Sequence, residues 1–140
     1  MTIKPYALNG GEGRTYQPYG PGFAVKAGSY ESEGGLVFIE VATRKGEEPG
    51  RHTHDGEDEI FYVLKGDVEF SCADETFRVG ENGFVFLPRN IEHGYTILNE
   101  GEARMLVVVA PPRWGESIEA QGVPISELAR VEHARRSQQA

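Results

Sequence analysis

Alternation of apolar and polar residues dominates the chain from about residue 35 to residue 110. Short stretches with a two-residue period predict β-strands, because neighbouring side chains of a strand point to opposite faces. Glycine, asparagine and proline interrupt these stretches at short intervals, which is typical of turns. We therefore predict strands at Gly22–Lys26, Leu36–Thr43, Glu59–Leu64 and Asp67–Cys72, two short strands on either side of residues 80–83, and two strands within HGYTILNEGEARMLVVVAPP.

Two of the connections resemble tight hairpin turns. Residues 65–66 separate Glu59–Leu64 from Asp67–Cys72, and residues 99–101 separate the last two strands. Turns of this length with glycine are typical of β-hairpins. Regularly spaced short strands of this kind predict an all-β fold, either a sandwich or a barrel.

The pattern changes on both sides of this region. Residues 1–34 are rich in glycine, tyrosine and proline and predict an irregular arm with edge strands. Apolar residues recur on one face over residues 124–136, which predicts a short C-terminal helix. Trp114 either anchors this tail on the core or covers the mouth of the barrel. We predict one domain with three segments: an N-terminal arm at 1–34, a barrel core at 35–112 and a C-terminal extension at 113–140.

Composition narrows the class of protein. The chain has 140 residues, of which 39% are hydrophobic and 26% charged, so it suits one globular domain with a real core. A net charge of -8 argues against nucleic acid or an anionic membrane as partner. The single cysteine, Cys72, excludes an internal disulfide and a cysteine-based zinc site. We see neither a signal peptide nor an apolar run of membrane-spanning length, so we expect a cytoplasmic protein.

Two of the four histidines stand two residues apart in GRHTHDGEDEIFYVLKG, residues 50–66. On extended backbone, His52 and His54 point the same way. Glu59 starts the next predicted strand, and His93 starts a later strand after a turn that could bring it alongside. Three neutral imidazoles and one carboxylate suit one divalent first-row metal: iron, manganese, nickel, cobalt, copper or zinc. An octahedral ion would keep two positions open for water, oxygen or substrate.

Other interpretations of this segment stay open. A bare H-x-H pattern is weak evidence, because a histidine in a loop is most often solvated. Glu57 or Asp58 could replace Glu59 as ligand if the strand began earlier, or both could be solvated. Arg51 could bind an anionic substrate or pair with a nearby acid.

The complete spacing of the segment is more specific than H-x-H alone. Gly46 is followed after five residues by His52 and His54, then after four residues by Glu59, and after six by Gly66. This series resembles the first motif of the cupins, G-x5-H-x-H-x3/4-E-x6-G, at every fixed position.

A second cupin motif, G-x5-P-x-G-x2-H-x3-N, is matched in part. Pro88 and His93 keep the proline-to-histidine spacing, while Asn90 stands where glycine is usual. Asparagine tolerates a positive φ better than most residues, so this departure is mild. The preceding glycine, Gly80 or Gly83, and the trailing Asn99 also lie off the expected offsets, but none of these positions is a ligand.

The resemblance covers residues 35–110 and implies a small antiparallel jelly-roll β-barrel. It also implies that the metal ligands are His52, His54, Glu59 and His93. Cupins carry many functions on one fold, and binding-only members often lose these ligands, so their retention favours an enzyme. The segments HTHDGEDEIFYVL and GFVFLPRNIEHGY resemble single-domain quercetinase-like (flavonol-dioxygenase-like) cupins. The same resemblance implies that the glutamate also acts as a base, which would make Glu59 a catalytic residue as well as a ligand.

We therefore predict a metal-dependent dioxygenase that acts on a small hydrophobic or phenolic substrate with O2. The alternatives are a non-redox metalloenzyme of secondary metabolism, such as a cyclase, isomerase or lyase, and a non-catalytic small-molecule-binding cupin. Family resemblance also predicts a homodimer. Side chains on the inward faces of the strands are expected to line the substrate pocket: Phe61, Val63, Phe70, Phe86, Tyr95, Ile97 and Met105. The choice between Phe70 and Phe86 stays open, and so does the inward face of the last strand, which carries Met105.

Overall fold

The computed structural model describes residues 4–16 and 20–112. The predicted helix at 124–136 and Trp114 lie outside these residues. No helix in the described part of the chain is long and apolar enough to cross a membrane. In chain order the described elements are β1 (Arg14–Tyr16), β2 (Gly20–Ala27), α1 (Ser29–Ser32), β3 (Val37–Arg44), β4 (Asp58–Lys65), β5 (Val68–Cys72), β6 (Glu75–Val79), β7 (Phe84–Leu87), β8 (His93–Ile97) and β9 (Glu102–Ala110).

The alternation of side chains located these strands well. Each strand with predicted bounds is present, and its ends differ by no more than two residues. The two short strands around residues 80–83 are β6 and β7. The one-turn helix α1 was not predicted, because four residues between glycines carry too little periodicity to be recognised.

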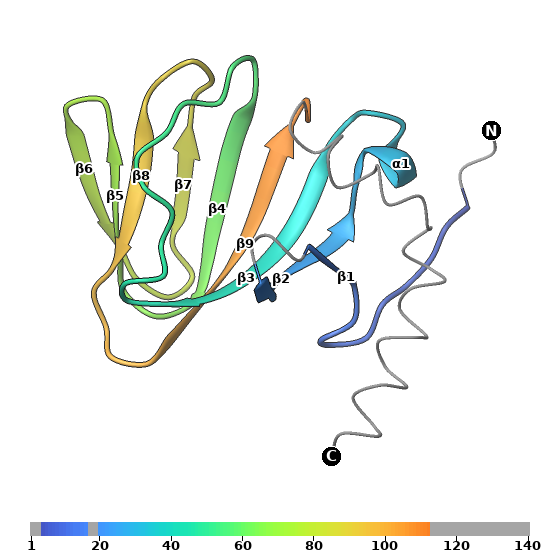
Figure 1. Cartoon of the computed structure of the whole chain (residues 1–140), viewed down its shortest axis with the longest axis horizontal. Coiled ribbons are helices and arrows are strands. Elements are labelled where there is room, and N and C mark those ends of the chain that lie inside the picture. Colours follow the sequence, from blue (N-terminus) through green and yellow to red (C-terminus); the bar gives the residue numbers. More distant parts are fainter. Residues whose placement is uncertain (1–3, 17–19, 113–140) are drawn as a thin grey trace.

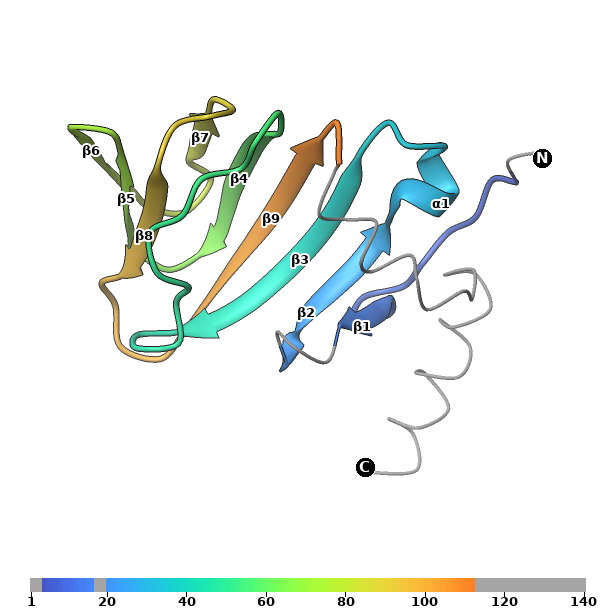
Figure 2. The ribbon, with the colours of Figure 1, turned by 45° about the horizontal axis from the view of Figure 1, so that its top comes forward.

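The strands form two antiparallel sheets. The larger has the order β1-β2-β3-β9-β4-β7, and the smaller has the order β6-β5-β8 (Figure 1). In Figure 2 the smaller sheet lies beside β7 and β4, whereas β3, β2 and β1 extend away from it. An all-β antiparallel fold is thus confirmed, but the expected closed barrel is wrong. Among the described residues, β7 and β6 end their sheets without pairing to each other, so the hydrogen-bonded ladder does not close.

Both predicted hairpins are also wrong. β4 pairs with β7 and β9, whereas β5 pairs with β6 and β8. The turns at residues 65–66 and 99–101 therefore carry the chain from one sheet to the other. A crossing connection and a hairpin show the same alternation in the strands that they join, so the pattern could not distinguish them.

The core fills the space between the inner faces of the sheets. On β9, Met105, Val107 and Val109 face inward, which answers a question that the sequence left open. The rings of Phe61 on β4 and Phe70 on β5 bring the two sheets together, with their centroids 5.0 Å apart. Glu59 and His93 are buried on the same inner faces. The alternation that builds the core thus also carries two polar side chains inward.

Candidate metal centre

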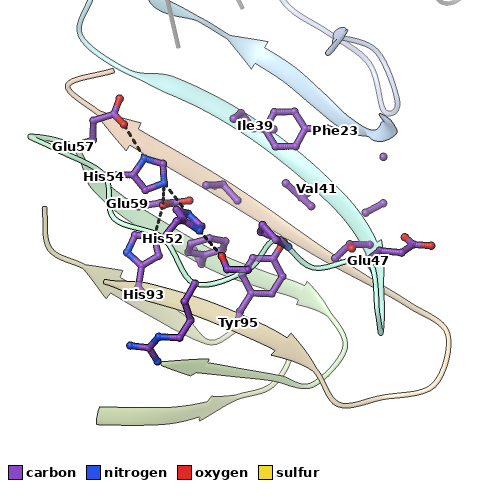
Figure 3. Close-up of a pocket in the computed structure, with 18 of the residues that line it drawn as sticks. Phe23, Ile39, Val41, Glu47, His52, His54, Glu57, Glu59, His93 and Tyr95 are labelled. Carbon is purple, nitrogen blue, oxygen red and sulfur yellow. Dashed lines mark hydrogen bonds and ion pairs between the residues drawn. The ribbon is translucent and has the colours of Figure 1, made fainter. Parts of the chain in front are cut away.

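Four side chains from three parts of the chain converge at one end of the space between the sheets (Figure 3). His52 and His54 come from the connection between β3 and β4, Glu59 from β4 of the larger sheet, and His93 from β8 of the smaller sheet. One ligand atom from each lies within 4.8 Å of all the others. The structure therefore brings together the four residues that the sequence singled out.

Backbone hydrogen bonds hold the histidine segment in place. His52 and His93 donate N–H groups to each other's carbonyl oxygens, both at 2.9 Å, which forms an isolated bridge between the loop and β8. Asn90 donates its N–H to the carbonyl of His54 at 2.9 Å and accepts the N–H of Gly56 on Oδ1 at 2.9 Å. Asn90 has φ +66°, as its place at a glycine position predicted. The turn before His93 thus fixes both flanks of the ligand segment.

The distances between the ligand atoms fit a single ion. Nε2 of His52 lies 3.0 Å from Nε2 of His54, which lies 3.1 Å from Oε2 of Glu59. Nε2 of His93 lies 3.0 Å from the same carboxylate oxygen. Ligands about 2.1 Å from an ion and at right angles to one another are about 3.0 Å apart. These three separations suit neighbouring ligands of one ion.

Two of these atoms lack any other partner. Oε2 of Glu59 and Nε2 of His93 are fully buried, and among the described residues neither has a hydrogen bond of acceptable geometry, although Oε2 lies 3.1 Å from Nε2 of His54 and 3.0 Å from Nε2 of His93. Buried polar atoms without partners are costly and rare. Both atoms are of the kinds that bind first-row metals. The donor set therefore fits one divalent ion.

Partners on the far side of two rings fix which nitrogen faces the centre. We assign the proton of His52 to Nδ1, which donates to the carbonyl oxygen of Gly50 at 2.7 Å. Nδ1 of His54 likewise donates to Oε1 of Glu57 at 2.8 Å. Each Nε2 then carries a lone pair that points into the group, which is how outer partners orient metal-binding histidines.

Glu57 was missed by the sequence analysis, which considered it as a substitute ligand or as solvated. It is neither, because its side chain is only 3% exposed and contacts the ring of His54 on the side away from the centre. Its place three residues after a ligand was the available signal. Asp58 and Arg51, whose roles the sequence left open, both form ion pairs. Asp58 pairs with Arg89 at 2.9 Å, and Arg51 pairs with Glu92 at 2.7 Å.

Charges within the group are coupled. Burial alone would raise the pKa of the Glu59 carboxyl, but His54 and His93 beside it outweigh burial and hold its pKa at about 2. Burial also acts to lower the pKa of His54, but Glu59 and Glu57 outweigh it and raise that pKa. Glu59 is therefore a carboxylate at neutral pH, and without a metal His54 favours its protonated form more than an ordinary histidine does.

A cavity of about 1520 Å³ adjoins the group, and all four ligands line it. Phe23 of β2 and Ile39 and Val41 of β3 form an apolar wall, and Tyr95 of β8 lies on the opposite side (Figure 3). No residue of β2 or β3 was predicted from the sequence to line the pocket. The alternation of apolar residues along β3 indicated that one of its faces is buried. It did not indicate that this face lies opposite the candidate ligands.

The predicted pocket residues have three different locations. Phe61 and Tyr95 line the cavity. Four others are fully buried in the core and do not line it: Val63, Phe70, Ile97 and Met105. Phe86 is wrong as a pocket residue, because Val85 and Leu87 are the inward residues of β7 and Phe86 on the outer face is 49% exposed.

Comparisons with known proteins agree with this architecture. Polyketide synthase CurC from Streptomyces cyaneus is 28% identical over 109 residues, which cover 78% of this chain and 65% of CurC. This chain therefore spans slightly less than two thirds of that relative. The crystal structure of KdgF from Halomonas sp. has a TM-score of 0.60 at 24% identity and covers 74% of this chain and 93% of its own.

A predicted oxalate decarboxylase from Thermotoga maritima has a TM-score of 0.60 at 20% identity, over 64% of this chain and 79% of that one. At these identities, the structural likenesses show the fold alone. The Cupin_2 family, described as a cupin domain, matches residues 39–109, which is half of the chain and includes all four candidate ligands. The chain belongs to the cupin family.

Proposed function

We propose that the protein is a metal-dependent dioxygenase that acts on a small hydrophobic or phenolic substrate, in the manner of quercetinase-like cupins. The observation that carries the proposal is the group of three imidazole nitrogens and one carboxylate that opens onto a partly apolar cavity. The cavity volume exceeds the range of about 300–1,000 Å³ that is usual for small-molecule sites. The cavity therefore has room for a substrate of two or three fused rings.

The chain's own residues have separate roles in this proposal. His52, His54, Glu59 and His93 would hold the ion, which when bound would bring O2 and the substrate together and stabilise negative charge on oxygen. In the manner of quercetinase-like cupins, the Glu59 carboxylate would also accept the proton of a substrate hydroxyl. The apolar side chains of β2 and β3 would exclude water from the bound rings.

A second candidate is a non-redox metalloenzyme, such as a cyclase. It is favoured by the similarity to CurC, which is named a polyketide synthase and aligns with 78% of this chain. In such an enzyme the same group would polarise a carbonyl oxygen of the substrate, and no O2 would be consumed. The residues that hold the ion and shape the cavity would be the same.

The proposal is tested first by metal content and then by oxygen uptake. We expect about one equivalent of a first-row metal in protein purified without an affinity tag. The double variant His52→Ala with His54→Ala should lose it, and Thr53→Ala, which changes the residue between the two ligands, should keep it. Absence of metal from the wild type after reconstitution would contradict the metal centre.

Oxygen uptake with flavonols and related phenols separates the two candidates. The dioxygenase consumes one O2 for each substrate molecule that disappears, and the double histidine variant consumes none. Conversion of a polycarbonyl substrate without oxygen uptake, again dependent on the metal, would support the non-redox enzyme and contradict the dioxygenase.

A further inference from the structure

Tyr95 lies beside the candidate metal centre but is not one of its ligands. It follows His93 by two residues on β8, so both side chains point inward (Figure 3). The Tyr95 ring packs against Phe61 and Phe70, with centroid distances of 5.6 and 5.9 Å. Because Phe61 and Phe70 are core residues, the ring has a fixed direction, and Tyr95 also lines the cavity.

The hydroxyl of Tyr95 has no hydrogen-bond partner among the described residues. Tyr6, in contrast, donates its hydroxyl to the carbonyl of Lys26 at 2.6 Å. Tyrosine hydroxyls in largely buried positions usually find a partner. An ordinary tyrosine hydroxyl is protonated at neutral pH, so this group is available as a hydrogen-bond donor.

The surroundings of this hydroxyl indicate what it could bind. Across the cavity the wall is formed by the apolar side chains of Phe23, Ile39 and Val41. The side that carries β4 and β8 presents two polar features to the cavity, the candidate metal-binding group and the Tyr95 hydroxyl. The lining also includes charged side chains such as Arg44, Glu47 and Arg51. A ligand that satisfies both features needs oxygen atoms along one edge and an apolar face on the opposite side.

We propose that Tyr95 donates a hydrogen bond to a second oxygen of the substrate, whose first oxygen is bound at the metal centre. The substrate class is a flat, mostly apolar ring compound with at least two oxygen atoms along one edge. This inference rests on the proposed function, because it requires that a substrate enters the cavity and meets the metal centre.

Calorimetric titrations of zinc-loaded protein without oxygen test the assignment. The probes are 1-naphthol, with one oxygen, and 1,3- and 1,8-dihydroxynaphthalene, which place a second oxygen at two different spacings. Wild-type protein should bind at least one of the diols about three- to tenfold more tightly than 1-naphthol, the range expected of one hydrogen bond. Tyr95→Phe should abolish that preference and leave the affinity for 1-naphthol unchanged. Tyr62→Phe, on the outer face of β4, should preserve the preference.

An equal preference in Tyr95→Phe and wild type would overturn the proposal, as would a wild type that binds none of the probes or binds all three equally. Metal content, measured on the same samples, shows that any loss does not come from a damaged centre. Zinc does not support redox chemistry, so this test does not depend on oxygenation. Failure of oxygen uptake would overturn the dioxygenase and leave the role of Tyr95 in place.

Discussion

At the scale of single residues, the candidate metal centre is supported by groups that are not among its four candidate ligands. Glu57 is the main one, because its buried carboxylate accepts the Nδ1 proton of His54 at 2.8 Å. This contact orients the ring and raises the electron density at Nε2. Gly50 does the same for His52 with a backbone carbonyl, which no side-chain substitution can remove. Glu57 is therefore the position at which such support can be tested.

We predict that metal affinity decreases in the order wild type, Glu57→Gln, Glu57→Ala. Glutamine can still accept the proton of His54 but lacks the charge, whereas alanine leaves Nδ1 unpaired. The loss for alanine should be about 10- to 100-fold, as for other partners of metal-bound histidines. Competition with a chromophoric chelator measures it. Asp55→Asn, an exposed change in the same loop, is the control. Equal affinities in all four proteins would show that Glu57 does not support the centre.

At the scale of elements, the turns at residues 65–66 and 99–101 connect the two sheets at the end away from the candidate ligands. The N–H of Asp67, just after the first turn, donates to Oδ1 of Asn99 in the second turn at 2.9 Å. The N–H of Leu98 donates to the carbonyl of Asp67 at 2.8 Å. Gly66 has φ +111°, and a Cβ there would lie 2.8 Å from Oδ1 of Asn99 and 2.9 Å from Cβ of Ala103. The turns therefore pack on each other.

Gly66→Ala should be more destabilising than Gly101→Ala. Both glycines have positive φ, but a Cβ on Gly101 has no atom within 4 Å, so only Gly66 adds a clash to backbone strain. We expect Gly66→Ala to lower the free energy of unfolding by about 2–4 kcal/mol. For Gly101→Ala we expect about 1–2 kcal/mol. Urea denaturation measures both. Similar losses would mean that the two turns are not packed as tightly as the structure has them.

At the scale of the whole molecule, the sequence predicted which four side chains converge better than it predicted the path of the chain. His52, His54 and Glu59 lie within eight residues of one another, so their spacing alone carried most of the information on the ligands. Which strands pair, and whether the ladder closes, depends on contacts distant in sequence, and alternation reports only which residues share a face. Phe86 shows the limit, because an aromatic residue in an alternating strand can belong to either face. The homodimer stays a prediction.

A bound metal would couple the two sheets. Glu59 belongs to the larger sheet and His93 to the smaller one, so a bound ion would link them and satisfy two buried atoms that otherwise lack partners. A ligand that binds only the folded state at 100 times its Kd stabilises it by about 2.7 kcal/mol. For a chain of this size, that corresponds to an increase in Tm of about 6–12 °C.

Calorimetric melting with added metal or chelator measures this increase. The metal-dependent increase in Tm should become smaller as the pH falls through the ordinary pKa of histidine, about 6.5, because protons compete with the metal for the same nitrogens. The raised pKa of His54 makes protons compete more strongly there than at an ordinary histidine. The double variant His52→Ala with His54→Ala is the control, and its Tm should not respond to metal. An equal response in that variant would mean that the ion stabilises the protein from another site, and no response in the wild type would mean that the two sheets are held together without it.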